Sequence, residues 1–467
     1  MFKRLASLVF VVLTLSTQVA TAQPPAATRW TGNTANAQSQ GFAQGDPLVL
    51  TWSLAPDGTP VGAVDPTVPP VSPANSNLIE FLDDIYGDIT VYQPILQDAF
   101  GRWGEVSGLT ILHESADDGI VGAFGQTGVR GDVRIDGGTI DGPQGVLAVS
   151  TVPNDSRITV DTSDGAFFGN TGLDSLRLRN VLTHEFGHSL GFFTAAEGGH
   201  IVSDDTRQLL EPTVDLNFDG PQYHDILSVQ REYGDALETG LGNDSSDIAT
   251  DLGLIDSGDA VLLGGSANRT TESALFPARR ASSFTGANDA FEILPDEVDF
   301  ISIDDQSDTD VFKFTIGELG FVDIVLDTLG ETYQIAGQVT GGITEAAEDS
   351  AGVTQVDFNT LERVNLGLEL LGPDGETVIA SSNSGGFGDD EFLSGIELAE
   401  GTYFVRIFGE NNLDTISLDT QFYGLSVGFQ AVAVPEPSSF AVLSLLGALC
   451  LTRRKRLQHY CGLVDRD

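Results

Sequence analysis

The side chains with the clearest chemical potential lie in one short run of the sequence, from His184 to Gly191. His184 and His188 are four residues apart, so on a helix their imidazoles lie one turn apart on the same face. Two imidazoles at that spacing can share one zinc ion, and zinc lowers the pKa of a water in an open position to roughly 7. Glu185 would take the proton of that water as it attacks a peptide carbonyl. The run therefore predicts a zinc site that hydrolyses peptide bonds.

A helix over 175–190 is predicted to carry this run. Its apolar residues recur at every fourth position and form a row for the core: Leu178, Leu182, Phe186 and Leu190. The two histidines form an adjacent row, and Gly191 is well placed to end the helix.

The rest of residues 46–236 predicts an α+β domain, in which helices pack against one twisted sheet. A strand at 48–54 is followed by helical spacing between 78 and 103. Further elements are predicted as strands at 109–112, 133–135, 145–149 and 158–160 and as a helix at 226–233.

Residues 237–430 change character to short strands separated by acidic turns, which predicts a linker and an all-β antiparallel sandwich. The predicted strands are 311–316, 321–326, 366–371, 377–380, 403–408 and 423–429.

The N-terminal end of the chain predicts a targeting segment followed by a leader. Residues 1–22 have two basic residues, a short apolar run and a small-residue cleavage site, which together predict a secretory signal peptide. Residues 23–45 are rich in Gln, Ala, Pro and Gly and predict a flexible leader. The only cysteines, Cys450 and Cys461, lie near the C-terminus, so the exported body is expected to fold without disulfides.

The chain is strongly acidic, with 68 Asp and Glu against 22 Lys and Arg and a formal net charge of −46. Such a field repels nucleic acid and favours cations, so no nucleic-acid partner is expected. His113 and His224 are assigned no functional role.

Residues 48–235 resemble a matrixin-type metzincin. Trp52 lies in a first strand, and residues 98–103 resemble a stretch of the first helix. Residues 145–148 with Pro153 resemble the edge strand that aligns substrate, and residues 225–234 resemble the closing helix. The resemblance implies a metzincin-like fold and a zinc-dependent endopeptidase that acts on proteins or peptides, with Glu185 as catalytic residue.

The chain departs from the matrixin pattern at two positions. Met1 is the only methionine, so Leu210 stands in the turn where matrixins place a methionine beneath the metal. Leucine can fill that volume, because such swaps usually cost under ~1.5 kcal/mol. Thr194 stands where the third zinc-binding histidine is expected.

We favour His200 as the third zinc ligand beside His184 and His188. The ten-residue interval from His200 to Leu210 is close to that of short-looped matrixins, and the small residues at 194–199 suit an inserted loop. Two alternatives stay open: a carboxylate from Glu197, Asp204 or Asp205, or a degenerate site that binds metal weakly.

Residues 242–430 resemble the pre-peptidase C-terminal sandwich of secreted bacterial proteases. The resemblance rests on residues 308–314, residues 368–375 and residues 401–407. This region contains a group of closely spaced acidic residues, Asp304, Asp305, Asp308 and Asp310. Their oxygens are ligands that calcium prefers, and a solvated turn is an equal alternative.

Residues 431–467 resemble a PEP-CTERM sorting tail, with Val434-Pro435-Glu436-Pro437 followed by an apolar stretch and a basic cluster. This resemblance implies recognition by an exosortase-type transpeptidase and a location outside the cell or at its surface. A plain membrane anchor is the alternative, and it also places the body outside.

Two functions remain in view. The first is a secreted, surface-sorted zinc endopeptidase. The second is a catalytically inactive matrixin-fold protein that acts as an extracellular matrix or adhesion protein. The completeness of the metal site separates them.

Overall fold

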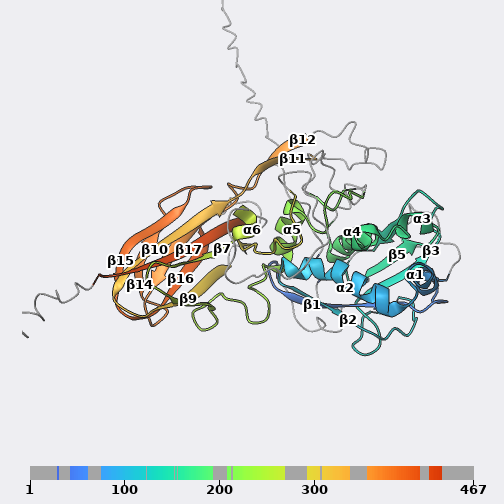
Figure 1. The fold of residues 1–467 in the computed structure, drawn as a ribbon, viewed down its shortest axis with the longest axis horizontal. Helices are drawn as coiled ribbons and strands as arrows, with labels where there is room; N and C mark the ends of the chain where they lie inside the picture. Colours follow the sequence, from blue (N-terminus) through green and yellow to red (C-terminus); the bar gives the residue numbers. More distant parts are fainter. Residues whose placement is uncertain are drawn as a thin grey trace, which may run out of the picture.

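A computed structural model describes residues 29–30, 43–61, 75–122, 124–151, 153–154, 156–192, 208–211, 214–268, 292–304, 308–336, 355–410 and 420–433. These residues form an elongated molecule with a mixed helix-and-sheet part beside a sheet-rich part (Figure 1). The predicted signal peptide and residues 434–467 of the predicted sorting tail lie outside the described residues. No helix in the described ranges is long and apolar enough to span a membrane.

The described residues of the N-terminal part, within 43–238, form one five-stranded sheet and five helices. The strands follow the order β2-β1-β3-β5-β4, in which β4 runs antiparallel to β5 at the edge and the other pairs are parallel. The strands are β1 Leu48–Leu54, β2 Leu109–His113, β3 Val133–Gly138, β4 Ala148–Ser150 and β5 Ser156–Asp161. The helices are α1 Leu78–Tyr86, α2 Ile89–Glu105, α3 Gly165–Phe168, α4 Gly172–Leu190 and α5 Tyr223–Tyr233.

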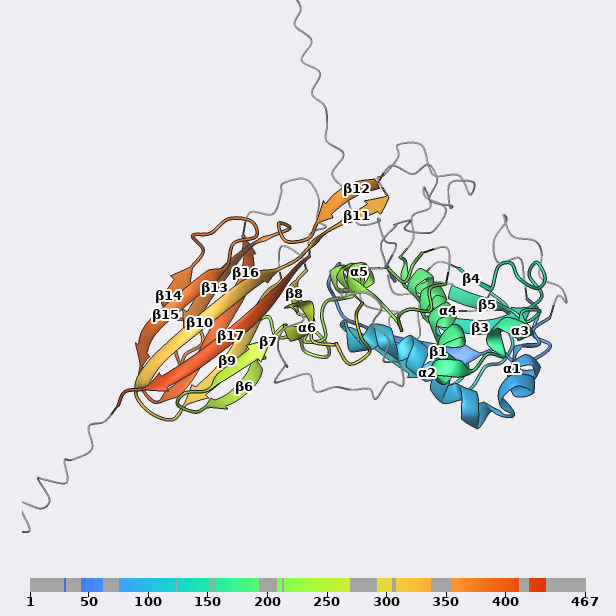
Figure 2. The same cartoon turned by 45° about the horizontal axis from the view of Figure 1, so that its top comes forward.

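The predicted helical spacing between 78 and 103 corresponds to two helices. Gly87 ends α1 with a φ of 99°, and the side chain of Asp88 accepts a hydrogen bond from the backbone N–H of Thr90 to begin α2. The break turns the chain so that both helices lie against the sheet (Figure 2).

Aromatic rings connect the sheet to the helix that carries the predicted zinc run. Trp52 of β1 contacts Phe100 of α2 with ring centroids 5.0 Å apart, and Phe100 contacts Phe186 of α4 at 4.8 Å. All three rings are fully buried. The column joins the sheet, α2 and α4 in one close-packed core.

The C-terminal sheet region, residues 250–431, has antiparallel sheets, as the sequence predicts. One sheet has the order β15-β10-β17-β7 with β8 also paired to β17, another has the order β14-β13-β16-β9-β6, and β11 pairs with β12. The parallel pairing of β6 with β9 was not anticipated. The elements are β6 Thr250–Ile255, β7 Ala260–Leu263, α6 Gly265–Asn268, β8 Ser302–Ile303, β9 Thr309–Ile316, β10 Gly320–Leu329, β11 Thr332–Ala336, β12 Gln355–Asn359, β13 Asn365–Leu371, β14 Val378–Ser382, β15 Glu391–Leu398, β16 Gly401–Glu410 and β17 Gln421–Ala431.

The two parts share one buried core, and α5 lies at their junction (Figure 2). Gln222 exchanges two hydrogen bonds with the backbone of Ile293, in which its side-chain oxygen accepts from the Ile293 N–H at 2.9 Å. The ring of Tyr223 lies 5.2 Å from that of Phe422 on β17. His224, for which no role is predicted, is fully buried here and lies 2.6 Å from the Tyr333 hydroxyl of β11.

We expect the two parts to unfold in one cooperative transition, because their apolar residues belong to one core. Tyr223→Ala should lower the free energy of unfolding by about 3–5 kcal/mol, measured by chemical denaturation. Phe392→Ala is the control; its ring is 56% exposed on β15 and its loss should change stability by about 0.5 kcal/mol or less. Two separate transitions in calorimetry would contradict a shared core.

Candidate metal centre

Helix α4 brings His184, Glu185 and His188 together inside the protein. The three residues are only 8%, 7% and 9% exposed. The two imidazoles face each other edge to face, with their Nε2 atoms 3.1 Å apart. The helix ends at Gly191, as predicted, with a left-handed φ of 109° that favours glycine.

The hydrogen bonds of the other ring nitrogens define which nitrogens can bind metal. His184 Nδ1 lies 2.9 Å from the carbonyl oxygen of Leu209, and His188 Nδ1 lies 3.1 Å from that of Phe192. A carbonyl oxygen only accepts, so both Nδ1 atoms carry the proton, and in the neutral rings both Nε2 atoms present lone pairs.

Two facing lone pairs repel each other unless a cation lies between them. Two nitrogens at the usual zinc–nitrogen distance and a tetrahedral angle are about 3.3 Å apart, close to the 3.1 Å between the Nε2 atoms of His184 and His188. The Nδ1–H bonds to carbonyls are also the outer contacts that orient histidine ligands. The two residues therefore fit a zinc ion.

Burial shapes the charges around this site. Desolvation raises the pKa of Glu185 to about 8 and lowers the pKa of His184, since both shifts avoid a buried charge. The neutral imidazole is the form that binds metal. A divalent cation beside Glu185 would favour the carboxylate, the form that accepts a proton.

An apolar turn at Leu209 and Leu210 packs against α4. Leu210 is fully buried, and a Cβ built on Gly187 would come within 2.8 Å of both Leu210 Cδ2 and Trp103 Cζ2. Asp225 of α5 fixes the turn, because its carboxylate accepts the backbone N–H groups of Leu209 and Gln222. Leu210 thus packs directly on the helix that carries the two histidines, and its role as a platform beneath a metal stays a prediction.

The predicted third ligand is not placed by the structure. His200 lies outside the described residues, as do Thr194 and the alternatives Glu197, Asp204 and Asp205, so the ligand remains a prediction. His113 lies elsewhere: it stacks on Trp52 at 4.3 Å.

The sheet edge nearest to α4 is β4, where the sequence predicts the substrate-aligning strand. β4 pairs with β5 on one side only within its sheet order. Ser150, its last residue, contacts α4 through a hydroxyl–hydroxyl distance of 2.8 Å to Ser189.

Residues 87–234 match the matrixin family. The matched segment includes α2, α4 and α5, the helices that build this site. The match implies a metalloprotease-type hydrolase that depends on zinc and acts on peptides or proteins. It covers about a third of the chain and leaves the C-terminal sheet region unassigned.

No protein of curated function matches the chain. Similar solved structures include a pre-peptidase C-terminal domain of collagenase from Bacillus anthracis, with 11% identity over 39% of this chain and 94% of that chain and a TM-score of 0.17. The insecticidal δ-endotoxin Cry8Ea1 from Bacillus thuringiensis has 10% identity over 30% of this chain and 20% of its own length, also with a TM-score of 0.17. At these TM-scores, neither similarity supports a conclusion about the fold or function of this chain.

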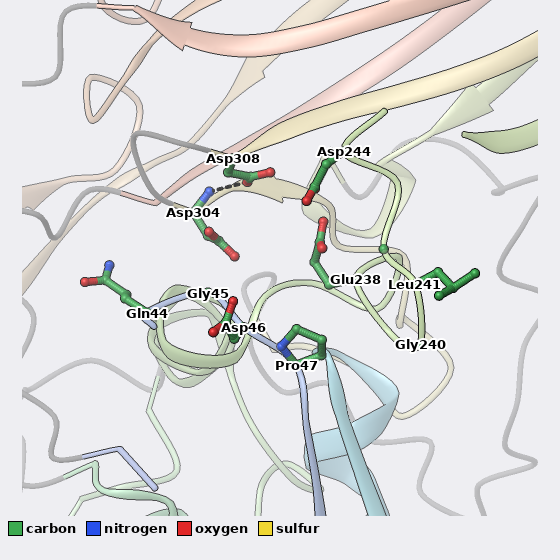
Figure 3. Close-up of a pocket in the computed structure, with 11 residues that line it drawn as sticks. Gln44, Gly45, Asp46, Pro47, Glu238, Gly240, Leu241, Asp244, Asp304 and Asp308 are labelled. Atoms are coloured by element: carbon green, nitrogen blue, oxygen red, sulfur yellow. Dashed lines mark hydrogen bonds between the residues drawn. The ribbon is translucent and has the colours of Figure 1, made fainter. Parts of the chain in front are cut away.

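A second group of acidic residues lies where the N-terminal part meets the C-terminal sheets (Figure 3). The ligand atoms of Glu238, Asp308 and Asp310 lie within 4.8 Å of one another. Asp304 and Asp244 line the same pocket, while Asp305 of the predicted calcium group lies outside the described residues. Glu238 and Asp244 were missed from sequence, because they are over 60 residues from Asp308 along the chain.

Burial is the main cause of raised pKa values in this acidic pocket. It raises the pKa of Glu238 to about 10 and that of Asp310 to about 7, and neighbouring carboxylates add to the shift of Glu238. Asp310 is held by Tyr423 Oη, which donates at 2.5 Å, and by Asn243 Nδ2, which donates at 2.6 Å. Without a cation, the folded protein therefore favours protonated carboxyls here.

The close contact at Gly187 predicts a pair of opposite mutational effects. Gly187→Ala should destabilise the protein by about 1–3 kcal/mol, because its Cβ would overlap Leu210 and Trp103. Gly101→Ala in α2 is the matched control; its Cβ would meet no atom within 4 Å, so it should stabilise by about 0.4–1 kcal/mol. Denaturant unfolding measures both, and equal effects would refute the packing argument.

Proposed function

We propose that this protein is an exported, surface-sorted zinc endopeptidase. The observation that carries the proposal is the pair of Nε2 atoms, 3.1 Å apart on α4 with Glu185 beside them, within a segment that matches matrixins. A zinc ion held there supplies a Lewis acid that polarises a peptide carbonyl and acidifies a water.

The residues of this chain have separate tasks in the proposed reaction. His184 and His188 hold the metal through Nε2, and the carbonyls of Leu209 and Phe192 fix the tautomers. The Glu185 carboxylate accepts a proton from the attacking water and delivers it to the nitrogen of the leaving amine. β4, which pairs only with β5 among the described strands, would pair through its other edge with the extended backbone of a substrate.

Several finer features belong to the same proposal. His200 is proposed as the third ligand, on the basis of its ten-residue interval to Leu210. The N-terminal signal pattern and the PEP-CTERM-like tail support export and recognition by an exosortase-type enzyme, and we propose a location outside the cell or at its surface.

Metal analysis of residues 23–433 tests the proposal. We expect one zinc per chain, lost or greatly weakened in His200→Ala and retained in the control His113→Ala. Glu185→Gln should keep zinc but lose protein-digesting activity by about 10²–10⁴-fold, the usual contribution of a general base.

The same measurements decide the alternative function. A wild-type protein that binds no zinc and digests no protein would favour the inactive matrixin-fold adhesion protein. Zinc binding that persists in His200→Ala would keep the endopeptidase and assign the third ligand to one of the carboxylates.

We further propose that the pocket of Glu238, Asp308 and Asp310 binds calcium as a structural ion. The support is geometric: three carboxylates converge, and a divalent cation would offset the cost of their mutual repulsion. Since Glu238 follows α5 and Asp310 belongs to β9, the ion would join the two parts of the molecule.

The raised pKa values predict how the calcium effect depends on pH. The folded protein binds more protons at these carboxyls than the unfolded chain does. Their contribution to stability is therefore present below about pH 4 and is lost as the pH rises through the raised pKa values of the folded protein. Calcium replaces those protons, so it should raise the Tm little at pH 5 and by several degrees at pH 8.

Thermal unfolding with and without millimolar calcium measures this effect. Glu238→Gln should reduce the calcium-induced rise in Tm, whereas Asp256→Asn, at an exposed position, should preserve it. An unchanged wild-type Tm at pH 8 on adding calcium would exclude the site.

A further inference from the structure

The C-terminal end of α4 is completed by residues from outside the helix. The last carbonyls of a helix have no partner within it and must be satisfied by other groups. The carbonyls of Gly187 and His188 accept from the backbone that follows the helix. Those of Ser189 and Leu190, one turn past Glu185, depend on side chains far away in sequence.

Trp30 and Tyr233 supply those two bonds. Trp30 Nε1 donates to the Ser189 carbonyl at 2.8 Å, and Tyr233 Oη donates to the Leu190 carbonyl at 2.7 Å. Tyr233 Oη also accepts the backbone N–H of Trp30 at 3.2 Å, so the two caps are linked. Both rings are at most 1% exposed, so water does not compete for these carbonyls.

Arg29 fastens the segment that carries Trp30. Its guanidinium donates to the carbonyls of Glu232 at 2.6 Å and Asp46 at 2.9 Å, and it lies 4.9 Å over the ring of Tyr233. The sequence places Arg29 and Trp30 in a flexible leader, whereas here both are buried against α4 and α5. Trp30 is one of two aromatic residues in the predicted leader, residues 23–45; the other is Phe42.

The capped end of α4 adjoins His188 of the metal centre. His188 Nδ1 is held by the Phe192 carbonyl, two residues after Leu190, and the Phe192 ring lies 6.3 Å from Tyr233. The Ser189 carbonyl accepts the indole N–H of Trp30, and the Ser189 hydroxyl contacts that of Ser150 on β4. Fraying of this turn would therefore displace the partner of His188 and one contact of the edge strand together.

We propose that Trp30 and Tyr233 are positioning residues for the metal centre, which they serve by capping α4 and so fixing His188. The proposal rests on the proposed function in that His188 binds zinc. It makes the segment at Arg29–Trp30 part of the metal site.

The test compares two Trp→Phe variants. Trp30→Phe keeps a buried ring but deletes the N–H to Ser189. Trp52→Phe is the matched control: Trp52 is fully buried, and its Nε1 has no hydrogen-bond partner among the described residues. We expect Trp30→Phe to raise the zinc dissociation constant by about tenfold, as loss of outer contacts to metal ligands does, and Trp52→Phe to leave it unchanged.

Hydrogen exchange of residues 186–192 provides a readout that needs no metal. In the metal-free protein, Trp30→Phe should speed exchange at this helix end about tenfold relative to Trp52→Phe. A wild-type protein that binds no zinc would refute the proposed function, while the exchange comparison would still decide the capping role.

Equal zinc affinity and equal exchange in Trp30→Phe and Trp52→Phe would overturn the proposal. If Trp30→Phe does not fold, Tyr233→Phe replaces it, because this change deletes one hydroxyl and keeps both rings. Tyr233→Phe should show the same weakened zinc binding and faster exchange, and wild-type behaviour in it would equally overturn the proposal.

Discussion

The burial of helix α4 is the constraint on which the rest of the structure depends. Its residues from Ser175 to Leu190 are almost all inaccessible to water, yet they include two histidines, a glutamate and terminal carbonyls that have no partner within the helix. Buried polar groups are costly unless each has a partner. Surrounding elements provide partners for the histidines and the carbonyls. Trp103 of α2 donates to the Thr183 carbonyl at 2.9 Å, the 209–210 turn accepts from His184, and Tyr233 of α5 donates to the Leu190 carbonyl.

The same constraint explains why the C-terminal sheets are more than an appended module. α5 holds the 209–210 turn through Asp225, and the other side of α5 is covered by the C-terminal region through Tyr223 and His224. Burial lowers the pKa of His224 to about 3, so this histidine stays neutral within the junction. The geometry of the metal centre is thus supported, through one intervening helix, by strands that lie more than 100 residues further along the chain.

Local sequence patterns predict most of the elements that position the site. The i,i+4 row from Leu178 to Leu190 predicts α4 and Gly191 predicts its end, because both follow from short-range periodicity in a contiguous segment. The match of residues 87–234 to matrixins agrees with that interpretation.

What the sequence does not predict depends on contacts between distant segments. Trp30 lies in a polar leader whose composition gives no sign of an anchor, and Glu238 joins Asp308 only through the packing of the two parts. The hairpin strands β11 and β12 are not among the strands predicted from sequence, although both alternate, with Tyr333 and Ile335 in one and Val356 and Phe358 in the other. Each has only five residues, and a pattern this short depends on its pairing partner to become a strand. His200 remains a prediction, as it lies outside the described residues.

The pairing of β17 bears on the order in which the chain can assemble. This last described strand lies between β10 and β7 and also pairs with β8, and its Phe422 contacts Tyr223 of α5. Contacts between residues this far apart in sequence form slowly, because a long loop must close first. A chain that is synthesised from its N-terminus therefore cannot complete the packing around α5 until β17 is available.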